Sequence, residues 1–370
     1  MKFNHRQRQQ RPLFLFQTKP DRLLLGVVFL LSLFGLLMVY NASTVEAFRD
    51  FGDKYYFVKN QLVWALGGWF TLLLFSFLDY HIFKKAALIA LIFNMLLLFL
   101  VLIPGMSTQI KGARRWLNLG VVNFQPTETL KTILAIYLAS WLEGERQMVA
   151  FLLLIGVILG LVMLQPDLGT AIVLIGSAFL VYYLSGAPVF KLFFLNLLLV
   201  SLGIALILIS PYRRSRLETF FDPTADPLGS AYHIRQVLVA LGSGGWTGVG
   251  LGQSRQKYQY LPEATTDSIF AVVAEETGFL GGAVLIGAFV VLIQRGLAIA
   301  QAAKDNFGRL LAGGITAWLA IQILVNLAAM VALLPLTGIP LPLFSYGGSS
   351  LVVTLASIGI LLSISRYNRI

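Results

Sequence analysis

The residue whose type and position best suit acid–base chemistry is Asp267, which leads from a polar segment into an apolar one. The surrounding stretch, residues 242–276, is the least membrane-like long stretch of a very hydrophobic chain. An ionised carboxylate at the mouth of a membrane span is costly, so such a residue is often functional. The structural alternative is a helix cap, because Thr265, Thr266 and Ser268 beside it are also cap-forming residue types.

Three further acids lie near Asp267 in the sequence: Glu263, Glu275 and Glu276. Four acids that face a basic upstream loop resemble a site whose pKa values are tuned for chemistry. A general base needs such tuning, because a sugar hydroxyl loses its proton only to a positioned acceptor in the transition state. We therefore predict that Asp267 is the base of a reaction at a hydroxyl group.

A second charged group begins with Glu128 and Lys131, which are three residues apart and share one face of a helix. An ion pair between them lowers the cost of placing either charge in a membrane. The structural alternative is a simple pair at a helix start, where Glu128 favours the positive end of the helix dipole. The functional interpretation is that Lys131 binds a substrate phosphate or tunes a nearby acid, together with Lys111, Arg114 and Arg115.

Three other segments are weaker candidates. Asp167, in a Gln-Pro-Asp-Leu-Gly-Thr sequence, is typical of a turn and helix cap. The glycine-rich segment of residues 242–252 is not a phosphate loop, because no strand precedes it and no Gly-Lys-Ser/Thr follows it. Its glycines instead favour a flexible backbone or a close approach to a lipid. Residues 340–350 predict either a pocket wall or tight packing of small residues.

The composition indicates a polytopic membrane protein. Hydrophobic residues make up 57% of the 370 positions and charged residues 12%, with a mean hydropathy of +0.79. Soluble proteins have about 25% charged residues. The net charge of +11 is dispersed between spans, which favours anionic lipids and phosphate-bearing substrates over nucleic acid. Because there are no cysteines, disulfides and thiolate zinc sites are excluded.

The apolar runs predict an all-α fold of about ten transmembrane helices with both termini inside. The predicted spans are Leu23–Tyr40, Phe57–Leu78, Phe83–Ile103, Thr127–Trp141, Met148–Leu164, Leu168–Leu184, one that ends near Ser210, Ser268–Ile293, Leu310–Leu334 and Leu341–Ile364.

The remaining segments complete one domain of residues 1–370. Residues 1–21 form a basic tail that the positive-inside rule places in the cytoplasm. Residues 104–126 are a polar outside loop whose basic residues violate that rule, which suggests that they act there. Residues 211–267 form a large extracytoplasmic loop between spans 7 and 8, with a short helix predicted at 232–241.

Motifs along the chain resemble those of one bacterial membrane family. They are KGARRWL (111–117), FQPTETLK (124–131), QPDLGT (165–170), DPLGSAYH (226–233), GVGLGQS (248–254), YLPEATTDSIFAVVAEETG (260–278) and PLPLFSYGGSS (340–350). In order and over nearly its whole length, the sequence is similar to the SEDS family of RodA, FtsW and SpoVE proteins.

The resemblance implies a multi-pass peptidoglycan glycosyltransferase of the bacterial cytoplasmic membrane, with its active site on the extracytoplasmic side. Such a protein would polymerise lipid II onto a nascent glycan strand, release undecaprenyl diphosphate and work with a class B penicillin-binding protein among membrane lipids. On this resemblance Asp267 matches the essential acid of the family. Glu128 and Lys131 match an acid and a lysine that face the same cavity.

The chemistry of the family assigns a role to each candidate. Asp267 would take the proton of the acceptor hydroxyl, and a single displacement would invert the donor's anomeric carbon without a covalent intermediate. The basic side chains Lys111, Arg114, Arg115 and Lys131 would stabilise the leaving diphosphate. A divalent cation, Mg or Mn, could also do so. No metal ligand is assigned. The predicted substrate-binding residues are Glu128, Lys131, Lys111, Arg114, Arg115 and Glu263.

Alternatives from other functional classes stay open. A flippase or transporter of lipid-linked precursors also needs about ten spans and intramembrane charges, although such proteins often contain inverted repeats and this sequence shows no convincing one. A scaffold for a partner synthase would have no chemistry of its own. The residues beside the candidate acid, LPEATTDS, do not decide between roles in elongation, division and sporulation.

Overall fold

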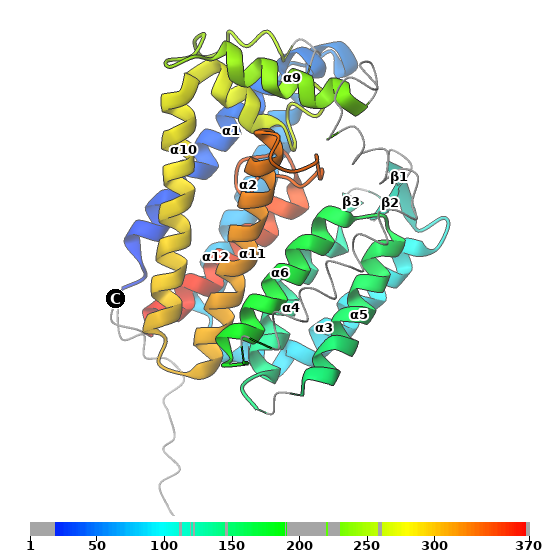
Figure 1. Cartoon of the computed structure of the whole chain (residues 1–370), viewed down its shortest axis with the longest axis vertical. Helices are drawn as coiled ribbons and strands as arrows, with labels where there is room; N and C mark the ends of the chain where they lie inside the picture. Colours follow the sequence, from blue (N-terminus) through cyan, green and yellow to red (C-terminus); the bar gives the residue numbers. More distant parts are fainter. Residues whose placement is uncertain are drawn as a thin grey trace, which may run out of the picture.

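The computed structural model describes residues 19–110, 113–118, 120, 123–144, 147–188, 190, 220, 230–257 and 261–367. Its helices are α1 (Arg22–Phe51), α2 (Tyr56–Phe77), α3 (His81–Leu102), α4 (Pro126–Trp141), α5 (Met148–Leu164), α6 (Leu168–Leu184), α9 (Ser230–Ser243), α10 (Ile269–Ala302), α11 (Asn306–Met330) and α12 (Gly348–Arg366). Figure 1 shows a bundle of long helices with α9 lying across one end.

The fold is that of an all-α polytopic membrane protein, as predicted. Among the described residues, α1, α2, α3, α10, α11 and α12 are long and apolar enough to cross a membrane. Helices α11 and α12 form the centre of the bundle, since 78% of the most apolar part of each is buried, against 22% in α2. The outer helices therefore present apolar side chains to lipid, while α11 packs on α4, α6 and α10.

Helix boundaries agree with the predicted spans where turn residues flank the apolar run. Helices α5 and α6 begin and end as predicted, and the short helix predicted at 232–241 is part of α9. Helix α1 instead continues to Phe51, eleven residues beyond the predicted end of the first span at Tyr40. The seventh predicted span, and residues 211–219 and 221–229 of the large loop, lie outside the described residues.

The last span was predicted to begin at Leu341, but α12 begins at Gly348. Pro340 and Pro342 have no backbone N–H to donate to a helix. The backbone around them bonds elsewhere: the Tyr346 amide donates to the carbonyl oxygen of Thr265 at 2.8 Å. Residues 339–346 therefore form a non-helical segment, which we call the pre-α12 segment.

Part of the predicted polar loop at residues 104–126 is a small antiparallel sheet of order β1-β2-β3. Its strands are β1 (Ser107–Ile110), β2 (Ala113–Asn118) and β3 (Asn123–Phe124). Ser107 pairs with Leu117, and Leu117 pairs with Phe124 on the other side. The sheet ties the end of α3 to the start of α4, which carries the Glu128–Lys131 pair.

The glycine-rich segment before α10 packs directly against the backbone of that helix. Gly278 interrupts α10 with a φ of 67°, and the amides of Phe279 and Leu280 donate to carbonyl oxygens of the segment. In return the Val249 amide donates to the Glu275 carbonyl oxygen at 3.0 Å. A Cβ at Gly248 would overlap the Glu276 carbonyl group. The close approach expected here is therefore to protein backbone and not to a lipid.

Candidate functional site

Asp267 is buried immediately before α10 and is held there by its backbone. Its residue is 7% exposed, and its carbonyl oxygen accepts a hydrogen bond of 2.9 Å from the Asn326 side-chain amide. The cap residue of α10 is Ser268, and no side-chain cap hydrogen bond forms there. The cap position of α10 therefore falls one residue after Asp267.

The pre-α12 segment forms a wall beside Asp267. The Ser345 hydroxyl donates to the Thr266 carbonyl oxygen, and Asn326 donates a second hydrogen bond to the carbonyl oxygen of Ile339 at 2.8 Å. Two non-glycine residues flank this region in the left-handed backbone conformation, Glu263 at a φ of 52° and Leu343 at 65°. Strained backbone of this kind often accompanies functional sites. Gly348, at the end of this region, packs so closely on Trp64 that a Cβ there would overlap the indole ring, which fits the small-residue packing alternative; a pocket wall at residues 340–350 stays a prediction.

Glu263 belongs to the same region as Asp267. The Thr266 hydroxyl donates to the Glu263 carboxylate at 2.7 Å and lies 3.3 Å from the Asp267 carboxylate. One hydroxyl therefore links the two acids. Among the described residues, no group of three or more His, Asp or Glu side chains gathers as a metal site.

Glu128 and Lys131 form a buried ion pair on α4, as their spacing predicts. The Lys131 ammonium lies 2.8 Å from the Glu128 carboxylate, and the two side chains are 2% and 4% exposed. The same ammonium donates to the Gln322 side-chain oxygen at 2.6 Å and lies 5.0 Å from the centre of the Trp318 ring. The pair is therefore fixed against α11.

Helix α11 connects this ion pair to Asp267 through side-chain amides. Gln322 accepts from Lys131 and donates to the Pro340 carbonyl oxygen at 2.8 Å. Asn326, one turn further along, donates to Ile339 and Asp267. Because residues four apart share a helix face, one stripe of α11 holds α4, the pre-α12 segment and Asp267 together. Gln322 and Asn326 were not among the predicted site residues, although two amides at this spacing in an apolar helix are a usable signal.

The orientation of both amides follows from their partners. The carbonyl oxygens of Pro340, Ile339 and Asp267 only accept hydrogen bonds, so each amide must present its NH₂ group to them. The Asn326 side-chain oxygen and the Trp318 indole N–H then have no hydrogen-bond partner among the described residues, although both are buried.

The basic residues of the loop before α4 are only partly placed. Lys111 lies outside the described residues. The Arg115 guanidinium donates to the Gln165 carbonyl oxygen at 3.1 Å and to that of Pro166. Arg114 precedes it on β2 and pairs with Gln109, while the register shift between Thr108 and Gln109 leaves Arg115 without a partner on β1. Arg115 thus supports the break between α5 and α6, and substrate binding by Arg114 and Arg115 stays a prediction.

Glu275 and Glu276 are placed apart from Asp267. Eight residues along the chain put Glu275 about 12 Å down the helix axis from Asp267. Both acids are almost fully buried and accept from backbone amides: Arg255 donates to Glu275 at 3.1 Å and Ser254 to Glu276 at 3.2 Å. Their side chains hold the residues just after the glycine-rich segment on α10, so the expected site of four acids reduces to Asp267 and Glu263.

Comparison with known proteins places the chain in a family. The family model described as a cell cycle protein, which covers FtsW, RodA and SpoVE, matches residues 21–370. Stage V sporulation protein E of Bacillus subtilis is 40% identical over 361 residues, 95% of this chain and 99% of that protein. The chain belongs to the FtsW, RodA and SpoVE family. The probable peptidoglycan glycosyltransferase FtsW of Trichlorobacter lovleyi, 40% identical, covers 93% of each chain.

Solved structures agree with membership in the FtsW, RodA and SpoVE family. The rod shape determining protein RodA of Thermus thermophilus has a TM-score of 0.71 and 31% identity, and the match covers 95% of this chain and 98% of RodA. A second match is a chain from a structure of a peptidoglycan synthase complex, described as coordinating polymerization and crosslinking. It has a TM-score of 0.77 and 32% identity, and the match covers 94% of this chain and 98% of that chain. The resemblance inferred from the sequence motifs is therefore confirmed.

Proposed function

We propose that this member of the FtsW, RodA and SpoVE family is a peptidoglycan glycosyltransferase that polymerises lipid II. Relatives of similar length that carry the glycosyltransferase name support the activity. The observation in the structure that carries it is the placement of Asp267: a buried acid, anchored by its backbone and connected through α11 to the buried Glu128–Lys131 pair.

In the proposed reaction, Asp267 accepts the proton of the acceptor sugar hydroxyl. The hydroxyl oxygen attacks the anomeric carbon of the donor as the bond from that carbon to the diphosphate oxygen breaks. The electron pair leaves with undecaprenyl diphosphate, and the proton stays on Asp267 until water removes it. A single displacement inverts the anomeric carbon.

The cations of the site would balance the charge of the departing diphosphate. An ammonium group has three N–H donors, and Lys131 uses two of them on Glu128 and Gln322. We propose that Lys131 positions Gln322 and offers its remaining donor to a phosphate oxygen, with Arg114, Arg115 and Lys111 as further cations.

A divalent cation, Mg or Mn, would supply additional positive charge for the same leaving group. Mg²⁺ is commonly bound through one or two carboxylates, with water and phosphate oxygens completing its shell. Glu263 and Asp267, linked by the Thr266 hydroxyl, are the carboxylates that fit this pattern. The cation takes no step in the mechanism above.

We further propose that the protein works with a class B penicillin-binding protein at the outer face of the cytoplasmic membrane. The solved relative within a peptidoglycan synthase complex supports a partner of this kind. The positive-inside rule supports the orientation, because Lys84 and Lys85 lie near the start of α3, at the end of that helix opposite the sheet.

The test is polymerisation of purified lipid II by the protein reconstituted with its partner synthase. We expect glycan strands to form and one undecaprenyl diphosphate to be released for each new glycosidic bond. The new linkages should have the β configuration. Transfer of lipid II across the bilayer without polymer would favour the flippase alternative. If neither polymer nor lipid transfer is detected with the partner and Mg or Mn supplied, the result would favour a scaffold.

A further inference from the structure

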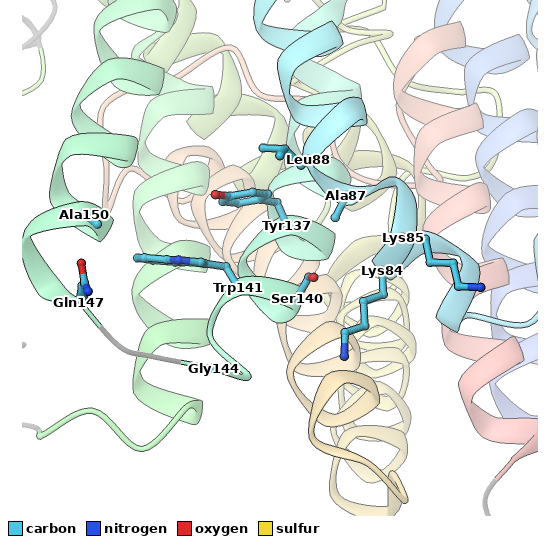
Figure 2. Close-up of a pocket in the computed structure, with 10 residues that line it drawn as sticks. All are labelled: Lys84, Lys85, Ala87, Leu88, Tyr137, Ser140, Trp141, Gly144, Gln147 and Ala150. Carbon is cyan, nitrogen blue, oxygen red and sulfur yellow. The ribbon is translucent and has the colours of Figure 1, made fainter. Parts of the chain in front are cut away.

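A pocket of about 580 Å³ lies at the end of the bundle opposite the candidate active site. Figure 2 shows it between the start of α3, the end of α4 and the start of α5. Thirteen residues of α4 separate Trp141 in this pocket from Glu128, a distance of about 20 Å along the helix. The pocket is therefore separate from the glycosyltransferase site and has no part in the proposed reaction.

The pocket has a cationic side and an aromatic side. Lys84 and Lys85 line one side, and Tyr137 and Trp141 of α4 place their rings together toward the start of α5 (Figure 2). Ser140 adds a hydroxyl between them. Lysine, tyrosine and tryptophan are the residues that concentrate where the lipid headgroups meet the acyl chains. The pocket therefore lies at headgroup level.

The wall of the pocket continues into a surface that faces acyl chains. Leu88 lines the pocket and is 55% exposed, and Ile92 and Phe99 further along α3 are 60% and 54% exposed. Large apolar side chains at this level of exposure are expected on a helix that contacts lipid. A ligand with a polar head and long apolar chains can follow this path from the pocket to α3.

The charges of the pocket favour a negatively charged headgroup. Lys84 forms an ion pair with Glu143 and lies 5.7 Å from the centre of the Phe307 ring. Lys85 has no ion-pair partner among the residues that the structure describes. The positive-inside rule places the start of α3, with these two lysines, on the cytoplasmic side. The cytoplasmic leaflet carries anionic lipids, and basic pockets between helices bind such headgroups.

We propose that this pocket is a binding site for an anionic phospholipid of the cytoplasmic leaflet. Lys84 and Lys85 bind the phosphate, Ser140 donates to a headgroup oxygen, and Tyr137 and Trp141 contact the first carbons of the acyl chains. Glu143 competes with the phosphate for Lys84, so the site holds the lipid reversibly.

Binding can be measured on the full-length protein in detergent with phosphatidylglycerol whose acyl chains carry bromine, which quenches nearby tryptophan fluorescence. We expect saturable quenching that is lost in Trp141→Phe, and markedly weaker quenching by phosphatidylcholine with the same chains. Equal quenching by the two lipids would overturn the proposal.

Charge variants separate this site from general attraction to an anionic surface. We expect the double variant Lys84→Gln/Lys85→Gln to bind phosphatidylglycerol roughly tenfold more weakly or worse. Glu143→Gln should bind more tightly, because Lys84 then loses its competing carboxylate. Lys304→Gln, an exposed lysine before α11, is the matched control and should bind as wild type does.

Two outcomes would contradict the assignment to a lipid. Equal weakening by Lys304→Gln and by the double lysine variant would show a diffuse surface charge instead of a site. Displacement of the brominated lipid by millimolar inorganic phosphate would show an anion site that does not need the acyl chains. Neither result bears on lipid II polymerisation, so failure here leaves the proposed function untouched.

Discussion

Asp167 and Asp267 both precede an apolar helix, and the two helix starts are built in different ways. Asp167 caps α6: its carboxylate accepts from the Thr170 amide at 3.1 Å and from the Thr170 hydroxyl at 2.8 Å. Asp267 lies one residue before the cap residue of α10, and Asn326 holds its backbone carbonyl oxygen. One carboxylate serves its own helix, whereas the other is positioned by a different helix.

This difference explains how a membrane protein can place an acid for chemistry. A carboxylate that accepts two hydrogen bonds from its own first turn is committed to helix stability. Anchoring the backbone instead fixes where the carboxylate lies through a contact with another helix. Such positioning matters because a displacement of about 1 Å can cost roughly a hundredfold in rate. The comparison therefore predicts that variants around Asp267 affect activity, whereas those around Asp167 affect stability.

The largest loss of stability is expected from breaking the Glu128–Lys131 pair. Lys131→Leu leaves the Glu128 carboxylate buried and unpaired, which should lower the free energy of unfolding by about 3–5 kcal/mol. Replacing both residues with leucine should restore part of that stability but not activity, because Gln322 still loses its donor. Thermal unfolding in detergent measures the first effect. A double variant as unstable as the sum of the single variants would contradict the buried ion pair.

Asn326→Leu should lower the turnover number by about a hundredfold, because the Asp267 backbone and the pre-α12 segment lose their common anchor. KM should change little, since the substrate-binding residues remain. Stability should fall by about 1–3 kcal/mol. Steady-state kinetics with lipid II separate the two parameters.

Gln165→Leu is the matched control for Asn326→Leu. Gln165 is buried beside the Asp167 turn, and its amide donates to the Leu98 carbonyl oxygen at 3.0 Å. Its loss should cost similar stability and leave the turnover number within a few-fold of wild type. Equal turnover numbers for the two variants would remove the distinction between the regions.

The smallest effect is expected at Asp167. Asp167→Ala removes the cap of α6 and should lower the free energy of unfolding by about 1 kcal/mol, while Asp167→Ser keeps a cap and most of that stability. Polymerisation by both variants should match wild type at temperatures well below unfolding. A large loss of activity in Asp167→Ser would place this acid in the reaction.

Local interactions could be predicted from the sequence. The Glu128–Lys131 pair and the Asp167 cap each join residues three apart, and their spacing alone indicated them. Helices α5 and α6 were also bounded correctly, because Gln147, Gln165 and the Pro166-Asp167 turn end their apolar runs. The assignment of Asp267 as the base came from the motif around it and stays a prediction.

Contacts between distant segments could not be predicted. The start of α12 depends on hydrogen bonds from the pre-α12 segment to residues about eighty positions earlier, such as that from Ser345 to Thr266. The anchoring roles of Gln322 and Asn326 depend on which backbone carbonyls α11 meets. The small sheet was missed because its short strands lack the alternation of polar and apolar residues that indicates a strand.

The most direct test of the account compares Asp267→Asn with Asp167→Asn in polymerisation of lipid II by the protein and its partner synthase. Asparagine preserves the size of each side chain and still caps a helix. We expect Asp267→Asn to fold and to lose activity by at least about a hundredfold, and Asp167→Asn to polymerise as wild type does. Wild-type polymerisation by a folded Asp267→Asn protein would contradict the assignment of Asp267 as the general base.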